Sequence, residues 1–190
     1  MNSYNITLRK TLLHLWKICI HKYYVARYCF KCGLYWQGIT HDLSKLSWTE
    51  FWESVRYFQG DSSPINEAKK DLGYSTAWQH HKGRNLHHYE YWTDNYDSGI
   101  TCIRMPYKYA VELICDWIGA GRAYQGKDFT YANEYKYVYN KLRTAKIHDD
   151  TKDFINFIFE HLAIYENDGI KKSFLLNKKT LKMIYQEFNK

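Results

Sequence analysis

The sequence predicts an all-α protein that folds as a single domain of about six or seven helices. Apolar residues recur at intervals of three and four along most of the chain, which is the spacing of a buried helix face. No segment shows the alternation of apolar and polar residues that is typical of a half-buried strand. Only ten glycines and two prolines interrupt the 190 residues. This length suits one domain with its own core, expected to span residues 1–190.

The N-terminal part is predicted to form a long helix, a short connection and a second helix. Residues 5–32 hold apolar positions at helical spacing, and no glycine or proline occurs in them until Gly33, a residue type favoured just after a helix end. Ser47 is followed three positions later by Glu50, which is the pattern of a capping box. We therefore expect a helix to begin at Ser47 and to end near Phe58.

The remaining helices are expected to be separated by turn-forming residues. Residues 60–64 read as a loop, and residues 65–82 show helical spacing again. The stretch 94–106 is expected to be an irregular connection without strands. Further helices are predicted over residues 106–121, 131–142, 152–167 and 176–188.

Composition and charge narrow the class of protein. Aromatic residues make up 18% of the chain, which argues against disorder, and no apolar run reaches the ~20 residues of a membrane span. The five cysteines lack zinc-site spacing, so we expect core packing for Cys29 and Cys32 and a cytoplasmic location. The formal net charge of +7 is consistent with a solvated basic surface and equally with an anionic partner, and no membrane partner is expected. Because no run of five basic residues occurs, nucleic acid is less favoured than a small anion.

Histidine and aspartate residues follow one another in an order that predicts a metal site. His41 and Asp42 are adjacent, His21 lies upstream, and two histidine pairs lie downstream. Glu112 and Asp116 fall within an apolar helical stretch, where burying a carboxylate is costly unless it is paired or binds a metal. Imidazole and carboxylate together suit divalent transition metals. We expect one or two ions of Mn, Fe, Co, Ni or Zn, with Mg as the alternative.

This order of residues resembles the HD-domain superfamily of metal-dependent phosphohydrolases, which are helical proteins named after their His-Asp doublet. The resemblance implies an HD-like helical bundle. It implies a first metal held by a helical histidine, the doublet and a distal aspartate, and a second metal held with the help of two further histidines. It also implies that Lys45 faces a substrate phosphate. The implied metal ligands are His21, His41, Asp42, His81, His88 and Asp116.

Two longer motifs resemble a bacterial and phage family of unknown function more closely. The motif H-D-x-S-K is present at residues 41–45, and H-x-x-x-N-x-H-H-x-E-[YH]-[WY] is present at residues 81–92. The resemblance covers about residues 10–125, which we expect to form the core around the metal site. The C-terminal helices, over about residues 130–190, match no motif.

Residues near the expected ligands are assigned to catalysis and substrate binding. His88 is preferred to His87 as a ligand because it follows His81 by seven residues, on the same helical face unless a turn intervenes. Metal-bound histidines usually donate their other N–H group, so Asn85 and Glu90 are expected to orient ligands. The expected catalytic residues are Lys45, Glu90 and Glu112, and the expected substrate-binding residues are Lys45, Lys82, Arg84, Asn85 and His87.

These residues predict metal-dependent hydrolysis of a phosphoester, with a nucleotide as the preferred small anionic substrate. Bound metals would activate water, and lysine and arginine side chains would hold the phosphate. Two alternatives use the same residues. In the first alternative, which the resemblance to the HD-type fold implies, the protein holds two irons and oxidises a small molecule with oxygen. In the second alternative, the protein is catalytically silent and binds a nucleotide or another protein. Metal content, phosphate release and oxygen consumption distinguish the three functions.

Overall fold

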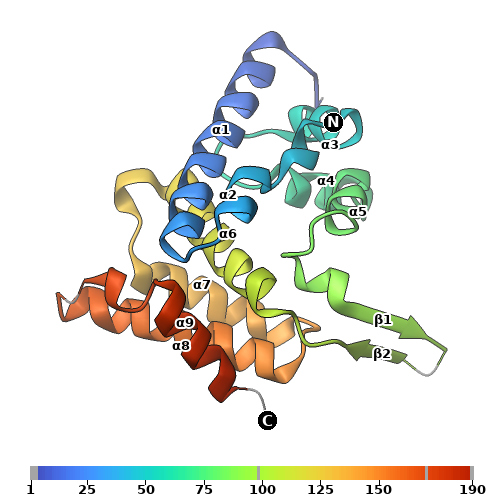
Figure 1. Cartoon of the computed structure of the whole chain (residues 1–190). Helices are drawn as coiled ribbons and strands as arrows, with labels where there is room; N and C mark the ends of the chain where they lie inside the picture. The colour runs from blue at the N-terminus through green and yellow to red at the C-terminus, as the bar shows by residue number, and fades with distance from the viewer. Residues whose placement is uncertain (1–3, 98, 170, 189–190) are drawn as a thin grey trace.

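The computed structural model describes residues 4–97, 99–169 and 171–188, and it confirms the all-α prediction (Figure 1). These residues form nine α-helices rather than six or seven. The helices are α1 (Leu8–Lys31), α2 (Tyr35–Thr40), α3 (Trp48–Tyr57), α4 (Pro64–Leu72), α5 (Thr76–Lys82), α6 (Tyr107–Gln125), α7 (Tyr131–Thr144), α8 (Asp149–Asn167) and α9 (Lys178–Glu187). The shorter elements are the 3₁₀ helices η1 (Leu43–Leu46), η2 (Tyr89–Trp92), η3 (Gly126–Asp128) and η4 (Lys172–Phe174), and the strands β1 (Thr93–Tyr96) and β2 (Gly99–Cys102).

Two predicted helix signals are confirmed. Gly33 follows α1 with a φ of 73°, which glycine adopts without a Cβ clash. Ser47 caps α3, because its Oγ accepts a hydrogen bond of 3.4 Å from the backbone N–H of Glu50. The reciprocal half of the capping box is absent between these two residues. The amide of Ser47 donates to a backbone carbonyl, and the Glu50 carboxylate contacts His80 and His81 on α5.

In two segments the secondary structure differs from the prediction. Residues 65–82 form two helices, α4 and α5, because Gly73 adopts a φ of 80° and the side chain of Ser75 caps a new helix. The stretch 94–106 contains most of an antiparallel hairpin, made of β1 and β2. The β2 residues Gly99–Thr101 are exposed, so this strand lacks the alternating pattern by which a half-buried strand is found in a sequence. Together with α2, the split helix explains why the helix count was too low.

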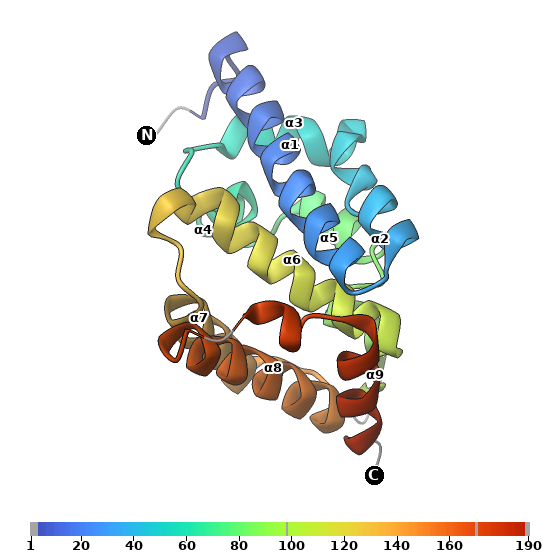
Figure 2. The same cartoon turned by 60° about the vertical axis from the view of Figure 1, so that its left-hand side comes forward.

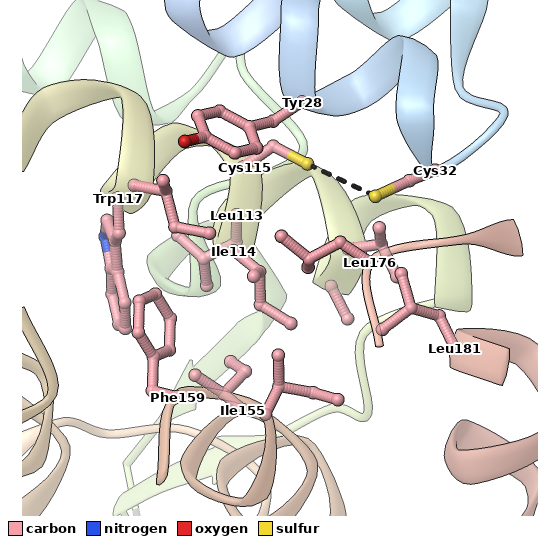
Figure 3. Packing of buried hydrophobic residues seen from close by; sticks show 14 of the residues in the cluster. Tyr28, Cys32, Leu113, Ile114, Cys115, Trp117, Ile155, Phe159, Leu176 and Leu181 are labelled. Carbon is pink, nitrogen blue, oxygen red and sulfur yellow. Dashed lines mark hydrogen bonds between the residues drawn. The ribbon is translucent and has the colours of Figure 1, made fainter. Parts of the chain in front are cut away.

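Helix α6 is the centre of the fold. Figure 2 shows α6 between α1 on one side and the layer of α7, α8 and α9 on the other. All residues from Ala110 to Gly119 are buried, which is the pattern of a helix that is covered on every side. In Figure 3, Ile114 of α6 packs among side chains that include Ile155 of α8 and Leu181 of α9. The apolar core therefore holds in place the helix that carries Glu112 and Asp116.

The cysteines confirm the expectation of core packing. Cys29 and Cys32 are fully buried, and the Sγ atom of Cys32 lies 3.9 Å from that of Cys115 (Figure 3). All five cysteines are free thiols. Within the described residues, no helix combines the length and the apolar character that crossing a membrane requires.

Helices α1 and α6 approach each other most tightly at Gly119. A Cβ atom added there would lie 2.5 Å from Cγ2 and 3.1 Å from the backbone nitrogen of Val25. Gly119→Ala is therefore expected to lower the free energy of unfolding by about 1–3 kcal/mol and the Tm by about 2–12 °C. Gly83→Ala is the control, because its nearest contact would be 3.5 Å. Calorimetry that finds equal Tm values for both variants would contradict a tight α1–α6 contact.

Candidate metal centre

The predicted ligands converge from distant parts of the chain on one buried place. The doublet lies in the turn between α2 and η1, where Asp42 has φ 56° and ψ 25°. It is the one non-glycine residue with a positive φ in the described part of the chain, and aspartate tolerates this conformation. The turn lets His41 and Asp42 face the same point, although neighbours on a helix would diverge by about 100°. The other predicted ligands are His21 of α1, His81 of α5, His88 of the loop before η2, and Asp116 of α6.

A first group of possible metal ligands consists of His21, His41, Asp42 and Asp116. One ligand atom from each lies within 4.8 Å of all the others. The Nε2 atom of His21 lies 3.3 Å from Oδ2 of Asp42 and 3.2 Å from Oδ1 of Asp116. The Nε2 atom of His41 lies 3.3 Å from the same two oxygens. All four side chains are buried. Two imidazole nitrogens and two carboxylate oxygens thus surround one position.

A second group consists of Asp42, His81, His87 and His88, whose ligand atoms also lie within 4.8 Å of one another. The Nε2 atoms of His81 and His87 lie 3.3 and 3.4 Å from Oδ1 of Asp42. Asp42 thus turns Oδ2 to the first group and Oδ1 to the second. Both groups of possible ligands therefore share the Asp42 carboxylate.

His87 and His88 both belong to this second group. The argument that favoured His88 does not apply, because α5 ends at Lys82 and the backbone turns before the second histidine pair. His87 was expected at the substrate, and the structure places its Nε2 beside Asp42 instead. The rings of His87 and His88 lie 4.3 Å apart. Helical spacing could not predict that both histidines belong to the same group of possible ligands.

Two glutamates hold the outer nitrogens of these histidines. Oε1 of Glu112 lies 3.0 Å from Nδ1 of His41 and 3.3 Å from Nδ1 of His87. Oε2 of Glu50 lies 2.7 Å from Nδ1 of His81. A carboxylate that accepts the Nδ1 proton leaves the Nε2 lone pair free for a metal, and such partners orient metal ligands in proteins. Glu112, which is expected to be catalytic, contacts two imidazoles in this structure, and its catalytic role stays a prediction. Glu50 was missed because its sequence pattern indicated only a cap.

Asn85 also contacts a predicted ligand. Its Nδ2 lies 3.1 Å from Nδ1 of His81 and 2.7 Å from Oγ of Ser44, and it donates to the carbonyl of His81 at 2.8 Å. The Asn85 amide nitrogen and the Nδ1–H group that His81 turns to Glu50 are both donors, so Asn85 is bonded to His81 through the backbone carbonyl and not through the ring. Asn85 does not line the cavity beside the cluster, and its orienting and substrate-binding roles stay predictions.

Unpartnered polar atoms at the centre test whether a metal ion fits. Within the described residues, Nε2 of four histidines and Oδ1 of Asp42 are buried without a hydrogen-bond partner, while Oδ2 of Asp42 forms an ion pair with Lys45. An unsatisfied buried polar atom costs about 1–3 kcal/mol, and one or two cations would satisfy all of these atoms. Nitrogen and oxygen donors of this kind suit the divalent transition metals. The four histidines are His21, His41, His87 and His88.

The electrostatic environment keeps two aspartates ionised and one histidine neutral, but it favours the protonated form of His41. Burial alone would lower the pKa of His41, but Asp42, Asp116 and Glu112 outweigh it and raise that pKa well above its usual range, so a metal ion must displace this proton. Burial alone would raise the pKa of Asp42, but His41 and Lys45 outweigh it and hold that pKa well below its usual range. The pKa of Asp116 is likewise lowered against burial, through contacts with His21 and His41. Burial and neighbouring histidines lower the pKa of His88, so this imidazole is neutral near pH 7. Ionised carboxylates and neutral imidazoles are the forms that bind metals.

Glu112→Gln tests the orienting role of the carboxylate between His41 and His87. The variant is expected to bind a divalent metal about 10–100 times more weakly, because both imidazoles lose the acceptor that fixes their Nδ1 protons. Competition with a metal-binding dye measures the affinity. Glu187→Gln, at the exposed end of α9, is the control. Unchanged affinity in the Glu112 variant would show that Glu112 does not orient ligands.

A cavity of about 460 Å³ opens beside both groups. Lys45 and Glu90, both predicted as catalytic, line it. The Nζ atom of Lys45 lies 2.5 Å from Oδ2 of Asp42, and Oε2 of Glu90 is buried without a hydrogen-bond partner in the described residues. The cations and aromatic residues of the wall are Lys17, Lys45, Lys69, Lys141, Trp78, Tyr89, Trp117, Tyr124 and Tyr137. The site thus has a basic, aromatic chamber next to its carboxylates.

The basic residues of this wall are mostly not the predicted ones. Lys82 and Arg84 lie outside the lining, and the Arg84 guanidinium donates to a backbone carbonyl of α5 at 3.5 Å. Their places are taken by Lys17 of α1, Lys69 of α4 and Lys141 of α7. No motif links these three lysines, and only helix packing brings them together.

His14 also lines this cavity, and it makes the stability of the protein sensitive to acid. Burial and the charge of Lys45 lower the pKa of His14 to about 4. The unfolded chain binds this proton near pH 6.5, so folded stability falls as the pH drops from about 6.5 toward 4. Between pH 7 and 5, the metal-free protein is expected to lose about 2 kcal/mol more unfolding free energy than His14→Leu. Urea denaturation at both pH values measures the difference, and equal losses would contradict it.

A family model described as a family of unknown function, DUF5662, matches residues 10–161. The chain therefore belongs to DUF5662. The match covers every residue of the candidate metal centre, and it extends beyond the region expected from the motifs to include α7 with Lys141. Comparisons with curated proteins and with solved structures each found no match.

Proposed function

We propose that this member of DUF5662 is a metal-dependent phosphohydrolase of the HD type, acting on a nucleotide or another small phosphoester. The observation that carries the proposal is the position of Asp42 between two groups of histidines, with Lys45 beside it. Two adjacent metal positions next to a cation are suited to a phosphoryl group, whose oxygens are shared between the ions while the ammonium group neutralises charge.

In this proposal, different residues of the chain orient the metal ligands, bind phosphate and accept a proton. Bound divalent ions would lower the pKa of a water molecule and polarise the phosphoryl group. Glu50 and Glu112 hold the imidazoles in place. Burial disfavours the charged form of Lys45, but Asp42 and Asp116 outweigh it and raise the pKa of Lys45, so its ammonium group stays protonated to bind a phosphate oxygen. Glu90 faces the same cavity and is assigned as a proton acceptor.

The cavity wall supports a nucleotide as the substrate. Its volume falls in the range of small-molecule sites, roughly 300–1,000 Å³. Lys69 lies 4.8 Å above the ring of Trp78, and Lys141 lies 4.8 Å above that of Trp117, so cations alternate with aromatic faces. The lysines suit further phosphates, and an aromatic face such as that of Tyr137 suits stacking with a base.

Elemental analysis and turnover assays test the proposal together. Protein purified without a metal-binding tag and reconstituted with Mn²⁺, Fe²⁺, Co²⁺ or Mg²⁺ is expected to hold up to two ions per chain, because the donor atoms form two ligand groups that share Asp42. A panel of nucleotides is then expected to release phosphate or nucleoside. A metal ratio near zero after reconstitution would overturn the proposal. Oxygen consumption by the iron form without phosphate release would indicate an oxygenase, and bound metal without any turnover would indicate a silent binding module.

A further inference from the structure

A second cavity, of about 360 Å³, lies apart from the candidate metal centre and shares no lining residue with the first cavity. It is bordered by the C-terminal half of α1, by α6, by the start of α7 and by η4. Four cations line it: Arg27, Lys31, Arg122 and Lys172. No carboxylate is among its described lining residues. Four like charges around one cavity repel each other, and an anion bound between them would remove this repulsion.

Three of the four cations of this cavity lie over aromatic rings. Arg122 lies 4.1 Å above the ring of Phe129, and Lys172 lies 5.7 Å above the ring of Tyr131. Lys31 lies 5.5 Å above the ring of Tyr28. A cation–π contact positions a cation but does not cancel its charge as a carboxylate would. The charges are therefore both placed and available to a ligand.

A pair of tyrosine hydroxyls lies beside these cations. The hydroxyl oxygens of Tyr28 and Tyr131 lie 3.1 Å apart, so one hydroxyl donates to the other and one O–H is left for a ligand, and both side chains are buried at the wall of the cavity. Glu166 contacts the nearby start of α7, but its Oε2 accepts from the backbone N–H groups of Tyr131 at 2.6 Å and Ala132 at 3.4 Å. This carboxylate is thus already engaged in capping a helix.

We propose that this cavity binds a small polyphosphorylated anion, of the class represented by pyrophosphate or the phosphate chain of a nucleotide. A guanidinium group offers two parallel donors to a phosphate, and lysines add point charges. Four cations exceed what a single phosphate neutralises, and they match two linked phosphates. They line one cavity of small-molecule size, which favours a compact anion over a nucleic-acid strand. This inference does not depend on phosphohydrolase activity.

Isothermal titration of the full chain with pyrophosphate in the presence of a chelator tests the proposal. We expect one binding site, with affinity reduced at least tenfold in Arg122→Gln and in the double variant Arg27→Gln/Lys31→Gln. The double variant changes two exposed side chains, so it decides the outcome if loss of the Arg122 packing prevents folding. Lys127→Gln, an exposed substitution in η3, is the matched control and is expected to bind as the wild type does, whereas Lys69→Gln reports any binding in the first cavity.

Three results would overturn this assignment. The first is equal affinity in all variants, and the second is a loss of affinity in Lys69→Gln alone, which would place the anion in the first cavity. The third is displacement of pyrophosphate by a single-stranded oligonucleotide that binds more tightly and depends on the same four cations. That result would indicate a nucleic-acid-binding surface.

Discussion

Asp42→Asn is expected to remove metal from both ligand groups at once and to abolish phosphate release. Each carboxylate oxygen of Asp42 faces one group of histidines, and an amide offers one weaker acceptor and no charge. Asparagine tolerates the positive φ of this position, so the turn is preserved. Metal at 1,000 times its Kd is expected to stabilise the wild type by about 4 kcal/mol, which raises the Tm by about 8–16 °C, while the variant shows almost no shift.

Elemental analysis and thermal unfolding with and without metal measure this effect. Asp128→Asn removes an exposed carboxylate in η3 and is expected to keep both the metal and the Tm shift. If the Asp42 variant still binds two ions per chain, Asp42 does not bridge the two groups.

Lys45→Met is expected to separate catalysis from metal binding. The methionine keeps much of the apolar stem but removes the ammonium group that lies 2.5 Å from Asp42. Phosphate release is expected to fall about 10²–10³-fold, which is the usual cost of losing one donor to a developing charge. Metal content is expected to stay the same or to rise, because a competing cation leaves the Asp42 carboxylate.

Steady-state kinetics on the reconstituted variant, with elemental analysis of the same sample, measure both quantities. Lys127→Met, an exposed substitution in η3, is the control. Unchanged kcat, or a loss of metal together with activity, would show that Lys45 does not act on the substrate.

Local signals explain which parts of the fold were predictable. Helix boundaries at Gly33 and Ser47 depend on the backbone conformation and hydrogen bonds of a few neighbouring residues, so they are visible in the sequence. The hairpin over residues 93–102 was missed because the exposed residues of its second strand produce no alternation of apolar and polar residues. Glu50 was interpreted only as part of a cap, although its carboxylate contacts two histidines on α5.

The donor groups of the candidate site could be predicted from the sequence. Histidines and carboxylates on apolar helices must be paired or bind a cation when they are buried, because an isolated buried charge is too costly. This argument identified Asp116 without any coordinates, and the order of histidines and aspartates along the chain identified His41 and Asp42. The argument from burial also identified Glu112 as a buried carboxylate that needs a partner.

The way in which Asp42 is shared between the two groups of histidines depends on tertiary packing. The packing of α1 against α6 sets the distance between His21 and Asp116, and the turn at Asp42 assigns one oxygen to each histidine group. Helix packing also brings the lysines of α1, α4 and α7 together in the wall of the first cavity. Helix formation depends on residues three and four positions apart, whereas convergence of distant side chains depends on how whole helices pack, which no local pattern of the sequence encodes.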